Sequence, residues 1–166
     1  SAIEGFARDE EIDLYALPDP NTFSILPWRP RENAFARMFC DIITPDEEPF
    51  EGDSRYVLRR TIERAANLGY TYYVGPELEY FYFKNSKSPE LLDQGGYFDQ
   101  DATDTSTDLR RETVLMLENL GIPVEQSHHE VSPSQHEIDL RHTDAMTMAD
   151  TVMTYRVAVK EVAQRH

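Results

Sequence analysis

The stretch Val124–Leu140, with the sequence VEQSHHEVSPSQHEIDL, constrains the fold of this chain more than any other segment. Its apolar side chains recur between acidic and imidazole side chains at the spacing of two that is typical of β-strands. In its middle, Ser132-Pro133-Ser134 is a turn signal. We therefore expect an antiparallel hairpin that reverses with Pro133-Ser134 as its loop.

This hairpin would sort its side chains onto two faces, with residue 130 opposite 137 and residue 128 opposite 139. One face would carry His128, Glu130, Glu137 and Asp139, and the other Val131, Ile138, His129, His136 and Leu140. Opposed like charges are destabilising by a few tenths to about 1 kcal/mol. A shared divalent cation would turn that repulsion into coordination, and oxygen ligands suit Mg²⁺ or Mn²⁺ better than zinc. A solvated polar face without a metal is the alternative that the pattern leaves open.

A second pair of carboxylates favours the metal interpretation. Glu77 and Glu79 lie two apart within the aromatic strand pattern of residues 71–83, so they point the same way. Burying one unpaired carboxylate costs on the order of several kcal/mol. If this strand is central in its sheet, a cation or a bound proton would be needed to neutralise the two carboxylates. Together with Glu130 and Glu137 they supply enough ligands for two divalent ions, unless this strand is an edge open to water.

The three histidines of the hairpin allow different interpretations. His128 and His129 could be metal ligands, phosphate contacts or half-buried imidazoles. His136 falls on the predicted apolar face, so we expect it to be structural.

Composition excludes several classes of protein. The 166 residues are 40% hydrophobic, enough for a packed core, and sixteen basic against thirty-one acidic residues give a net charge of −15. That charge argues against a nucleic-acid or anionic-membrane partner, because both need a basic surface. Cys40 is the only cysteine, which excludes an intrachain disulfide and a thiolate zinc cluster. The sequence has neither a membrane-spanning apolar run nor an opening signal peptide, and we expect a cytoplasmic location.

The pattern of strands and helices predicts two domains. Residues 1–42 carry short strand patterns at about 14–21, 23–29 and 34–42, and the acidic connector 44–52 is the expected boundary. Helices are expected from Asp53-Ser54 to about Leu68, from Leu109 to Leu120 with Thr107 or Asp108 as cap, and from Ala145 onward. In the third helix, Met146, Ala149, Met153 and Val157 form the expected buried stripe, widened by Val152, Val159 and Val162. This helix runs to His166 without a cap, which suggests a chain cut inside a larger fold.

Five ordered motifs resemble a type I glutamine synthetase over nearly the whole chain. They are Gly75–Phe81, Gly95–Phe98, Asp108–Glu112, His128–Val131 and Gln135–Ile138, and residues 1–6 also resemble the end of a family motif. The resemblance implies an α+β fold. In it, part of a β-grasp domain (residues 1–42) precedes the first portion of a catalytic domain (residues 43–166) built on an antiparallel sheet with packed helices.

The same resemblance implies an activity and a set of site residues. The family ligates ammonia to L-glutamate with ATP through a γ-glutamyl phosphate, using Mg²⁺ or Mn²⁺, in homo-oligomers whose active sites lie at subunit boundaries. The matching positions are Glu79, Glu130 and Glu137 for one metal, Glu77 for a second metal beside the ATP phosphates, Glu125 and His128 for the nucleotide, and Tyr97 for the ammonium and glutamate pocket.

Several family segments are absent from this sequence, including the N-G-[SA]-G-x-H motif and the glutamate-binding arginines. We therefore expect the isolated chain to be inactive. Two alternatives stay open: a γ-glutamyl-amine or polyamine ligase of the same fold, and a truncated metal-binding or interaction module without catalysis.

Overall fold

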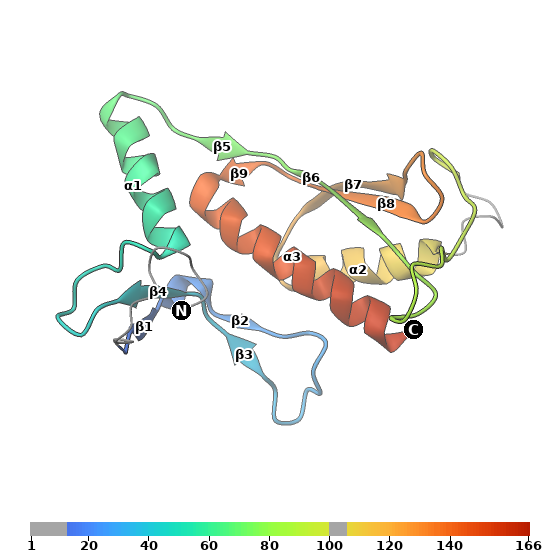
Figure 1. Ribbon diagram of the computed structural model, residues 1–166, viewed down its shortest axis with the longest axis horizontal. Helices are drawn as coiled ribbons and strands as arrows, with labels where there is room; N and C mark the ends of the chain where they lie inside the picture. The colour runs from blue at the N-terminus through green and yellow to red at the C-terminus, as the bar shows by residue number, and fades with distance from the viewer. Residues whose placement is uncertain (1–12, 100–105) are drawn as a thin grey trace.

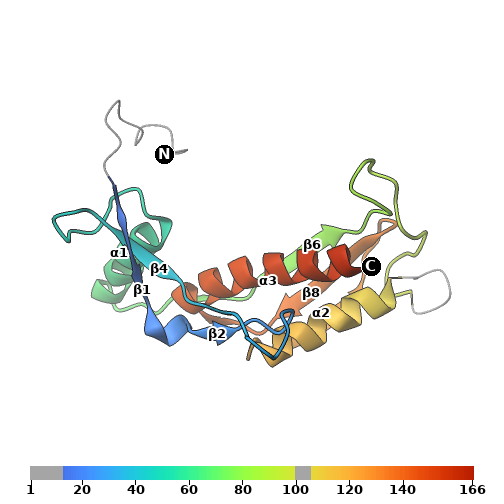
Figure 2. The same cartoon turned by 90° about the horizontal axis from the view of Figure 1, so that it is seen from below.

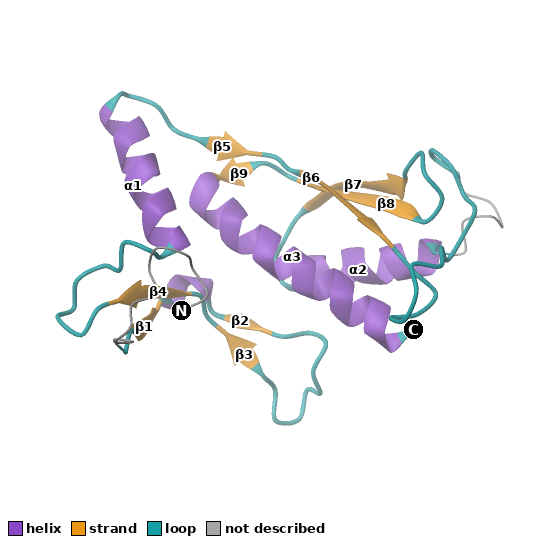
Figure 3. Ribbon diagram, in the orientation of Figure 1, coloured by secondary structure: helices purple, strands orange, loops and turns teal. Residues whose placement is uncertain are grey.

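A computed structural model describes residues 13–99 and 106–166, so the opening motif at residues 1–6 lies outside the described residues. The fold is a mixture of small antiparallel sheets and helices (Figure 3). In chain order the elements are β1 Tyr15–Pro18, a 3₁₀ turn Pro20–Thr22, β2 Ser24–Ile25, β3 Ala36–Arg37, β4 Cys40–Ile43, α1 Ser54–Asn67, β5 Tyr73–Val74, β6 Glu77–Phe81, α2 Thr107–Asn119, β7 Val124–His129, β8 Gln135–Leu140, β9 Thr143–Asp144 and α3 Ala145–Arg165. None of the described helices is long and apolar enough to cross a membrane.

The largest sheet has the strand order β6-β8-β7, and helices α2 and α3 lie side by side against one of its faces (Figures 1 and 2). The core forms between these layers, where Leu117 of α2, Ile138 of β8 and Val162 of α3 are fully buried. Trp28, from the loop after β2, joins the same core. Burying the apolar face of the sheet leaves its other face, which carries the charged residues, free for a site.

The hairpin β7–β8 forms with its turn at Pro133-Ser134, but the predicted register is wrong. His128 pairs with Glu137 and His129 with His136, so residue 130 is not opposite 137 and residue 128 is not opposite 139. A two-residue hairpin loop needs a positive φ at its first central residue, and the proline ring fixes φ of Pro133 near −65°. The strands therefore stop pairing at His129, and residues 130–134 form the loop. The shift is two residues, so the paired side chains keep their predicted faces, whereas Val131, predicted on the apolar face, lies in the loop and is 68% exposed.

The buried face of α3 also differs from the predicted stripe. Met153 is 51% exposed and Val157 is 45% exposed, whereas Met148, Tyr155 and Ala158 face the core. The valines predicted to widen the buried stripe agree with the structure, because Val162 is buried and Val152 and Val159 pack against the core. Apolar residues surround most of this helix, so its periodicity alone could not fix which side is buried.

Helix ends agree closely with the sequence. Asp53 caps α1 by accepting from the Arg55 backbone N–H at 3.1 Å, and Asp144 caps α3 by accepting from Thr147 at 3.0 Å. Gly69 and Gly121 follow α1 and α2 with φ of 85° and 76°, values that favour glycine. Helix α2 starts at Thr107, two residues earlier than predicted.

The predicted strands are interrupted where the backbone bonds elsewhere. The segment 34–42 divides into β3 and β4 because Phe39 donates its N–H to the Thr22 hydroxyl and accepts from the Asp19 N–H, at 2.7 and 2.8 Å. The segment 71–83 divides at Gly75-Pro76, where proline has no N–H for a ladder. The segment 23–29 keeps only the two residues of β2 as a strand.

Arg55 at the start of α1 connects the N-terminal strands to the helical layer. Its guanidinium is within 3.1 Å of Asp19, 2.6 Å of Asp41 and 2.9 Å of Asp150 of α3. Hydrogen bonds from this cation to Asp150 are the first cause that raises its pKa above the ordinary arginine value. The hairpin β1–β4 is thereby tied to α1 and α3 by one nearly buried cation.

Candidate metal centre

Carboxylates from β6 and β8 and an imidazole from β7 gather on the face of the sheet that points away from the helices. In the β6–β8 ladder Glu79 pairs with Glu137 and Glu77 pairs with Asp139, and in the β7–β8 ladder His128 pairs with Glu137. Side chains directly opposite each other share a face, so all five lie on one side of the sheet. The structure thus brings both predicted carboxylate pairs onto a single surface.

The centre of this surface is formed by His128, Glu130 and Glu137, whose ligand atoms all lie within 4.8 Å of one another. His128 Nε2 is 2.9 Å from Glu130 Oε1 and 3.0 Å from Glu137 Oε2. The Gln126 amide nitrogen is 3.3 Å from His128 Nδ1. Because that amide nitrogen only donates, Nδ1 accepts and Nε2 carries the hydrogen that faces the two carboxylates.

The centre holds more negative charge than its protein neighbours neutralise. Burial, reinforced by the Glu130 and Asp139 carboxylates, raises the pKa of Glu137 to about 8. The Val131 backbone N–H, 2.9 Å away, lowers the pKa of Glu130, so that group is ionised. Within the described part of the chain, the buried Oδ1 of Asp139 has no hydrogen-bond partner. Several carboxylate oxygens are a donor set that fits Mg²⁺ or Mn²⁺.

Glu77 and Glu79 differ in how close they come to this centre. Glu79 is opposite Glu137 and accepts a hydrogen bond from the side chain of Gln135. Glu77 lies two residues further along the strand, opposite Asp139, and both glutamates are outside the group of three. Strand β6 is an edge of its sheet within the described residues, and both glutamates are exposed. The burial cost expected for a central strand therefore does not apply to them.

Two aromatic rings from the loop after Gly95-Gly96 lie against His128. The Phe98 ring stacks on the imidazole with centroids 4.6 Å apart and planes within 5°, and the Tyr97 ring meets it edge-on at 5.7 Å. Tyr97 is 58% exposed, so its ring is open to solvent beside the charged face. Sequence reasoning selected Tyr97 but missed Phe98, for which the Gly-Gly-Tyr-Phe motif was the available signal.

Glu125 is placed differently from the other predicted residues. It is the extra residue of an irregularity in β7 between Val124 and Gln126, and its side chain is exposed. It lies three residues before His128 on the same strand, outside the group of three acidic and imidazole side chains.

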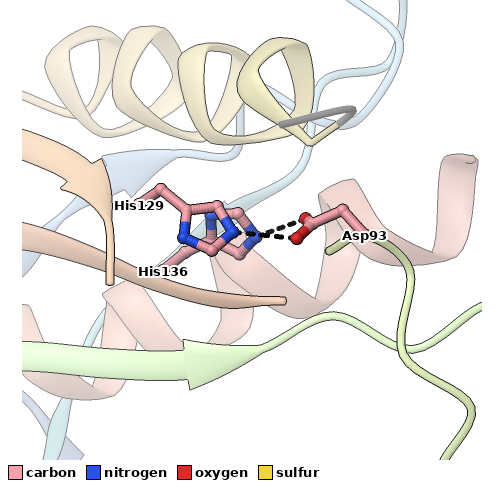
Figure 4. A group of neighbouring side chains, drawn as sticks. All are labelled: Asp93, His129 and His136. Atoms are coloured by element: carbon pink, nitrogen blue, oxygen red, sulfur yellow. Dashed lines mark hydrogen bonds and ion pairs between the residues drawn. The ribbon is translucent and has the colours of Figure 1, made fainter. Parts of the chain in front are cut away.

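The opposite face of the hairpin carries a second polar group, formed by Asp93, His129 and His136 (Figure 4). His129 Nε2 is 2.8 Å from Asp93 Oδ1, and His136 Nε2 is 3.4 Å from Asp93 Oδ2. Both histidines are fully buried, which agrees with the apolar face on which the sequence analysis placed them. Asp93 was missed, because its segment has the composition of an ordinary loop.

Comparison with known families identifies the chain. The model of the glutamine synthetase catalytic domain matches residues 51–166, and the model of the glutamine synthetase β-Grasp domain matches residues 1–45. The chain belongs to the glutamine synthetase family. This confirms the resemblance seen in the ordered motifs.

Curated glutamine synthetases share about half of their residues with this chain. The enzyme of Mycolicibacterium smegmatis is 53% identical over 98% of this chain, and that of Methanosarcina mazei is 49% identical over 98%. The enzyme of Thermotoga maritima is 47% identical over 100% of the chain. The chain spans only 38%, 37% and 39% of the length of these three relatives.

Solved structures share the fold of this chain. A cryo-EM structure of Plasmodium falciparum glutamine synthetase matches with a TM-score of 0.84 at 26% identity, covering 99% of this chain and 38% of that one. A complex of GmaS with ADP matches with a TM-score of 0.85 at 27% identity, covering 97% of this chain and 37% of that one. The predicted α+β fold of the glutamine synthetase family is therefore confirmed.

Proposed function

We propose that this chain supplies the metal-binding face of an active site that ligates ammonia to L-glutamate with ATP, through a γ-glutamyl phosphate. One observation carries the proposal. In a chain of this family, His128, Glu130 and Glu137 converge within 4.8 Å on the sheet face that also bears Glu77 and Glu79. Relatives named glutamine synthetase that are about 50% identical over nearly the whole chain support the same reaction.

Each carboxylate has a proposed role. Glu79, Glu130 and Glu137 would hold one Mg²⁺ or Mn²⁺ ion, and Glu77 would hold a second one beside the ATP phosphates. When bound, such a cation would supply positive charge that offsets the negative charge of a phosphoryl group during its transfer. Glu137, protonated near neutral pH by its surroundings, gives up that proton when it becomes a ligand.

The side chains around the carboxylates would bind and orient the substrates. His128 keeps its Nε2 hydrogen on the charged face, held by Gln126 on one side and stacked under Phe98 on the other, and would contact the nucleotide phosphates. Glu125 would bind elsewhere on the nucleotide. Tyr97, exposed beside His128, would border the pocket for ammonium and glutamate.

The remaining expectations belong to the same proposal. We propose a division into a β-grasp portion, residues 1–42, and a catalytic portion, residues 43–166. The two family matches, to residues 1–45 and 51–166, are compatible with a boundary in this region. A homo-oligomer and a cytoplasmic location are expected by analogy with the family.

A metal titration tests the assignment. Calorimetry with Mn²⁺, with and without a non-hydrolysable ATP analogue, should give saturable binding to this chain that Glu130→Gln weakens by at least about 10-fold. Glu90→Gln is the matched control, because Glu90 is an exposed glutamate paired with Lys84 away from the charged face. Equal Mn²⁺ affinity in the wild type and the Glu130 variant would overturn the assignment. ADP release that requires both glutamate and ammonia would establish the ligase reaction itself.

A further inference from the structure

Asp93 is a buried carboxylate with an unusually complete set of donors. Its Oδ1 accepts from the Gly95 N–H at 3.0 Å, the Ser134 N–H at 2.9 Å and His129 Nε2 at 2.8 Å. Its Oδ2 accepts from the hydroxyl of Ser106. Burial opposes the charge, but these bonds outweigh it and hold the pKa of Asp93 at about 2. The group is therefore an ionised carboxylate whose oxygens are already satisfied.

The two histidines beside Asp93 have the residue types of a metal site but lack free lone pairs. His129 Nδ1 is 2.7 Å from the Glu130 carbonyl oxygen and its Nε2 faces Asp93, so both ring nitrogens carry hydrogen. In His136 the Arg110 guanidinium is 2.8 Å from Nδ1 and, since it only donates, occupies that lone pair. The remaining Nε2 of His136 carries its hydrogen toward Asp93. A metal ion would have to break the hydrogen bonds of His129 Nε2 with Asp93 and of His136 Nδ1 with Arg110 to bind.

Two further hydrogen bonds fasten the loop that follows Asp93 to the β7–β8 hairpin. The Asp93 N–H donates to the Ser134 hydroxyl at 2.8 Å, and the Phe98 N–H donates to the His129 carbonyl at 3.0 Å. The approach is so close that a Cβ on Gly95 would lie 2.8 Å from His129 Nε2. The loop is thus held at both ends, by Asp93 and by Phe98.

This attachment has a consequence on the other face of the sheet. His128 and His129 are neighbours in β7, so their side chains point to opposite faces. The loop held on His129 crosses to the charged face and stacks Phe98 on His128 at 4.6 Å. The position of the Tyr97 and Phe98 rings at the candidate metal centre therefore depends on Asp93.

We propose that Asp93 is a positioning residue, which with His129 and His136 forms a metal-free clamp that sets the Gly95–Phe98 loop against His128. The inference deepens the function proposed for the charged face and rests on it for its consequence on metal and substrate binding. The clamp itself is a property of the metal-free chain.

The test compares two buried aspartates by nuclear magnetic resonance of the histidine rings and by Mn²⁺ calorimetry. Stacking under Phe98 should shift the His128 ring protons upfield in the wild type, and Asp93→Asn should remove that shift and weaken Mn²⁺ binding by about 10-fold. Asp53→Asn is the control, since Asp53 is 8% exposed and caps α1 away from the loop. It should lower the melting temperature while the His128 shift and the Mn²⁺ affinity stay as in the wild type.

A second variant reaches the loop by a different route. Gly95→Ala places a methyl group against His129 without changing the charge of Asp93, and it should also remove the upfield shift. An unchanged His128 shift in folded Asp93→Asn and Gly95→Ala proteins would overturn the positioning role. Added Zn²⁺ should change the ring resonances of His128. If it changed those of His129 and His136 and not those of His128, the proposal that the clamp is metal-free would be overturned. Failure of the wild type to bind Mn²⁺ would contradict the proposed function alone, because the ring shift is measured without metal.

Discussion

Glu79 of β6 lies directly opposite Glu137 of β8, so two carboxylates share one pair of the antiparallel ladder. With both groups ionised such a pair would destabilise the sheet by a few tenths to about 1 kcal/mol, and the raised pKa of Glu137 avoids this near neutral pH by keeping that carboxyl group protonated. Asp139, two residues along β8, adds a third carboxylate, and its Oδ1 has no hydrogen-bond partner among the described residues. An arrangement that would weaken the metal-free fold when fully ionised is physically reasonable where a divalent cation completes it.

The two faces of the hairpin predict different effects of mutation. Glu130→Gln and Glu137→Gln should each weaken Mn²⁺ binding by at least about 10-fold, because both remove a charged ligand. His136→Ala should lower the melting temperature more than it changes the Mn²⁺ affinity, since His136 is buried on the other face against Arg110. Calorimetry and thermal unfolding of the three variants check this. Equal losses of affinity in all three would contradict the face assignment.

The raised pKa of Glu137 predicts a loss of stability with pH. Its folded pKa of about 8 exceeds the ordinary value near 4.5, so the folded state binds the proton more tightly than the unfolded state. This contribution is fully present below about pH 4.5 and is lost as the pH rises through about 8. Urea unfolding at pH 5 and pH 8.5 should show the wild type losing stability relative to Glu137→Gln. Parallel pH profiles for the two proteins would argue against a protonated Glu137.

Cation binding should release that proton. At pH 7 the metal-free Glu137 is mostly protonated, and as a ligand it must ionise, so about one proton should leave per cation bound. Calorimetric enthalpies for Mn²⁺ measured in buffers of different ionisation enthalpy give the number directly. The Glu137→Gln variant serves as the control and should release fewer protons, whereas equal release would assign the proton to another group.

Arg55 should be a major determinant of how the N-terminal strands attach. Arg55→Met would leave Asp19, Asp41 and Asp150 without their shared cation. We expect a loss of about 2–3 kcal/mol, below the value of about 3–5 kcal/mol for fully buried pairs because the three carboxylates are partly exposed. Arg60→Met is the control, since its pair with Glu51 is exposed and should contribute less than about 1 kcal/mol. Denaturant unfolding of both variants measures the difference.

Long-range contacts limited what could be predicted about the site. The sequence assigned Glu77, Glu79, Glu130 and Glu137 to matching faces, because the alternation of a strand depends only on neighbouring residues. It could not show that Glu79 would face Glu137, nor that Asp93 would reach His129, since those residues are far apart in the chain. Asp93 lies in a segment of ordinary loop composition, and its role appears only once the loop is folded over the hairpin.

The sequence by itself determined both ends of α1, the start of α3, the end of α2 and the side of the sheet on which each paired hairpin residue lies. Asp53, Gly69, Gly121 and Asp144 act through caps and backbone conformations that extend over a few residues. The tertiary structure alone decided the hairpin register, the buried side of α3 and the clamp at Asp93. These depend on which surfaces compete for burial and for hydrogen bonds, and that competition is resolved only when the whole chain is packed.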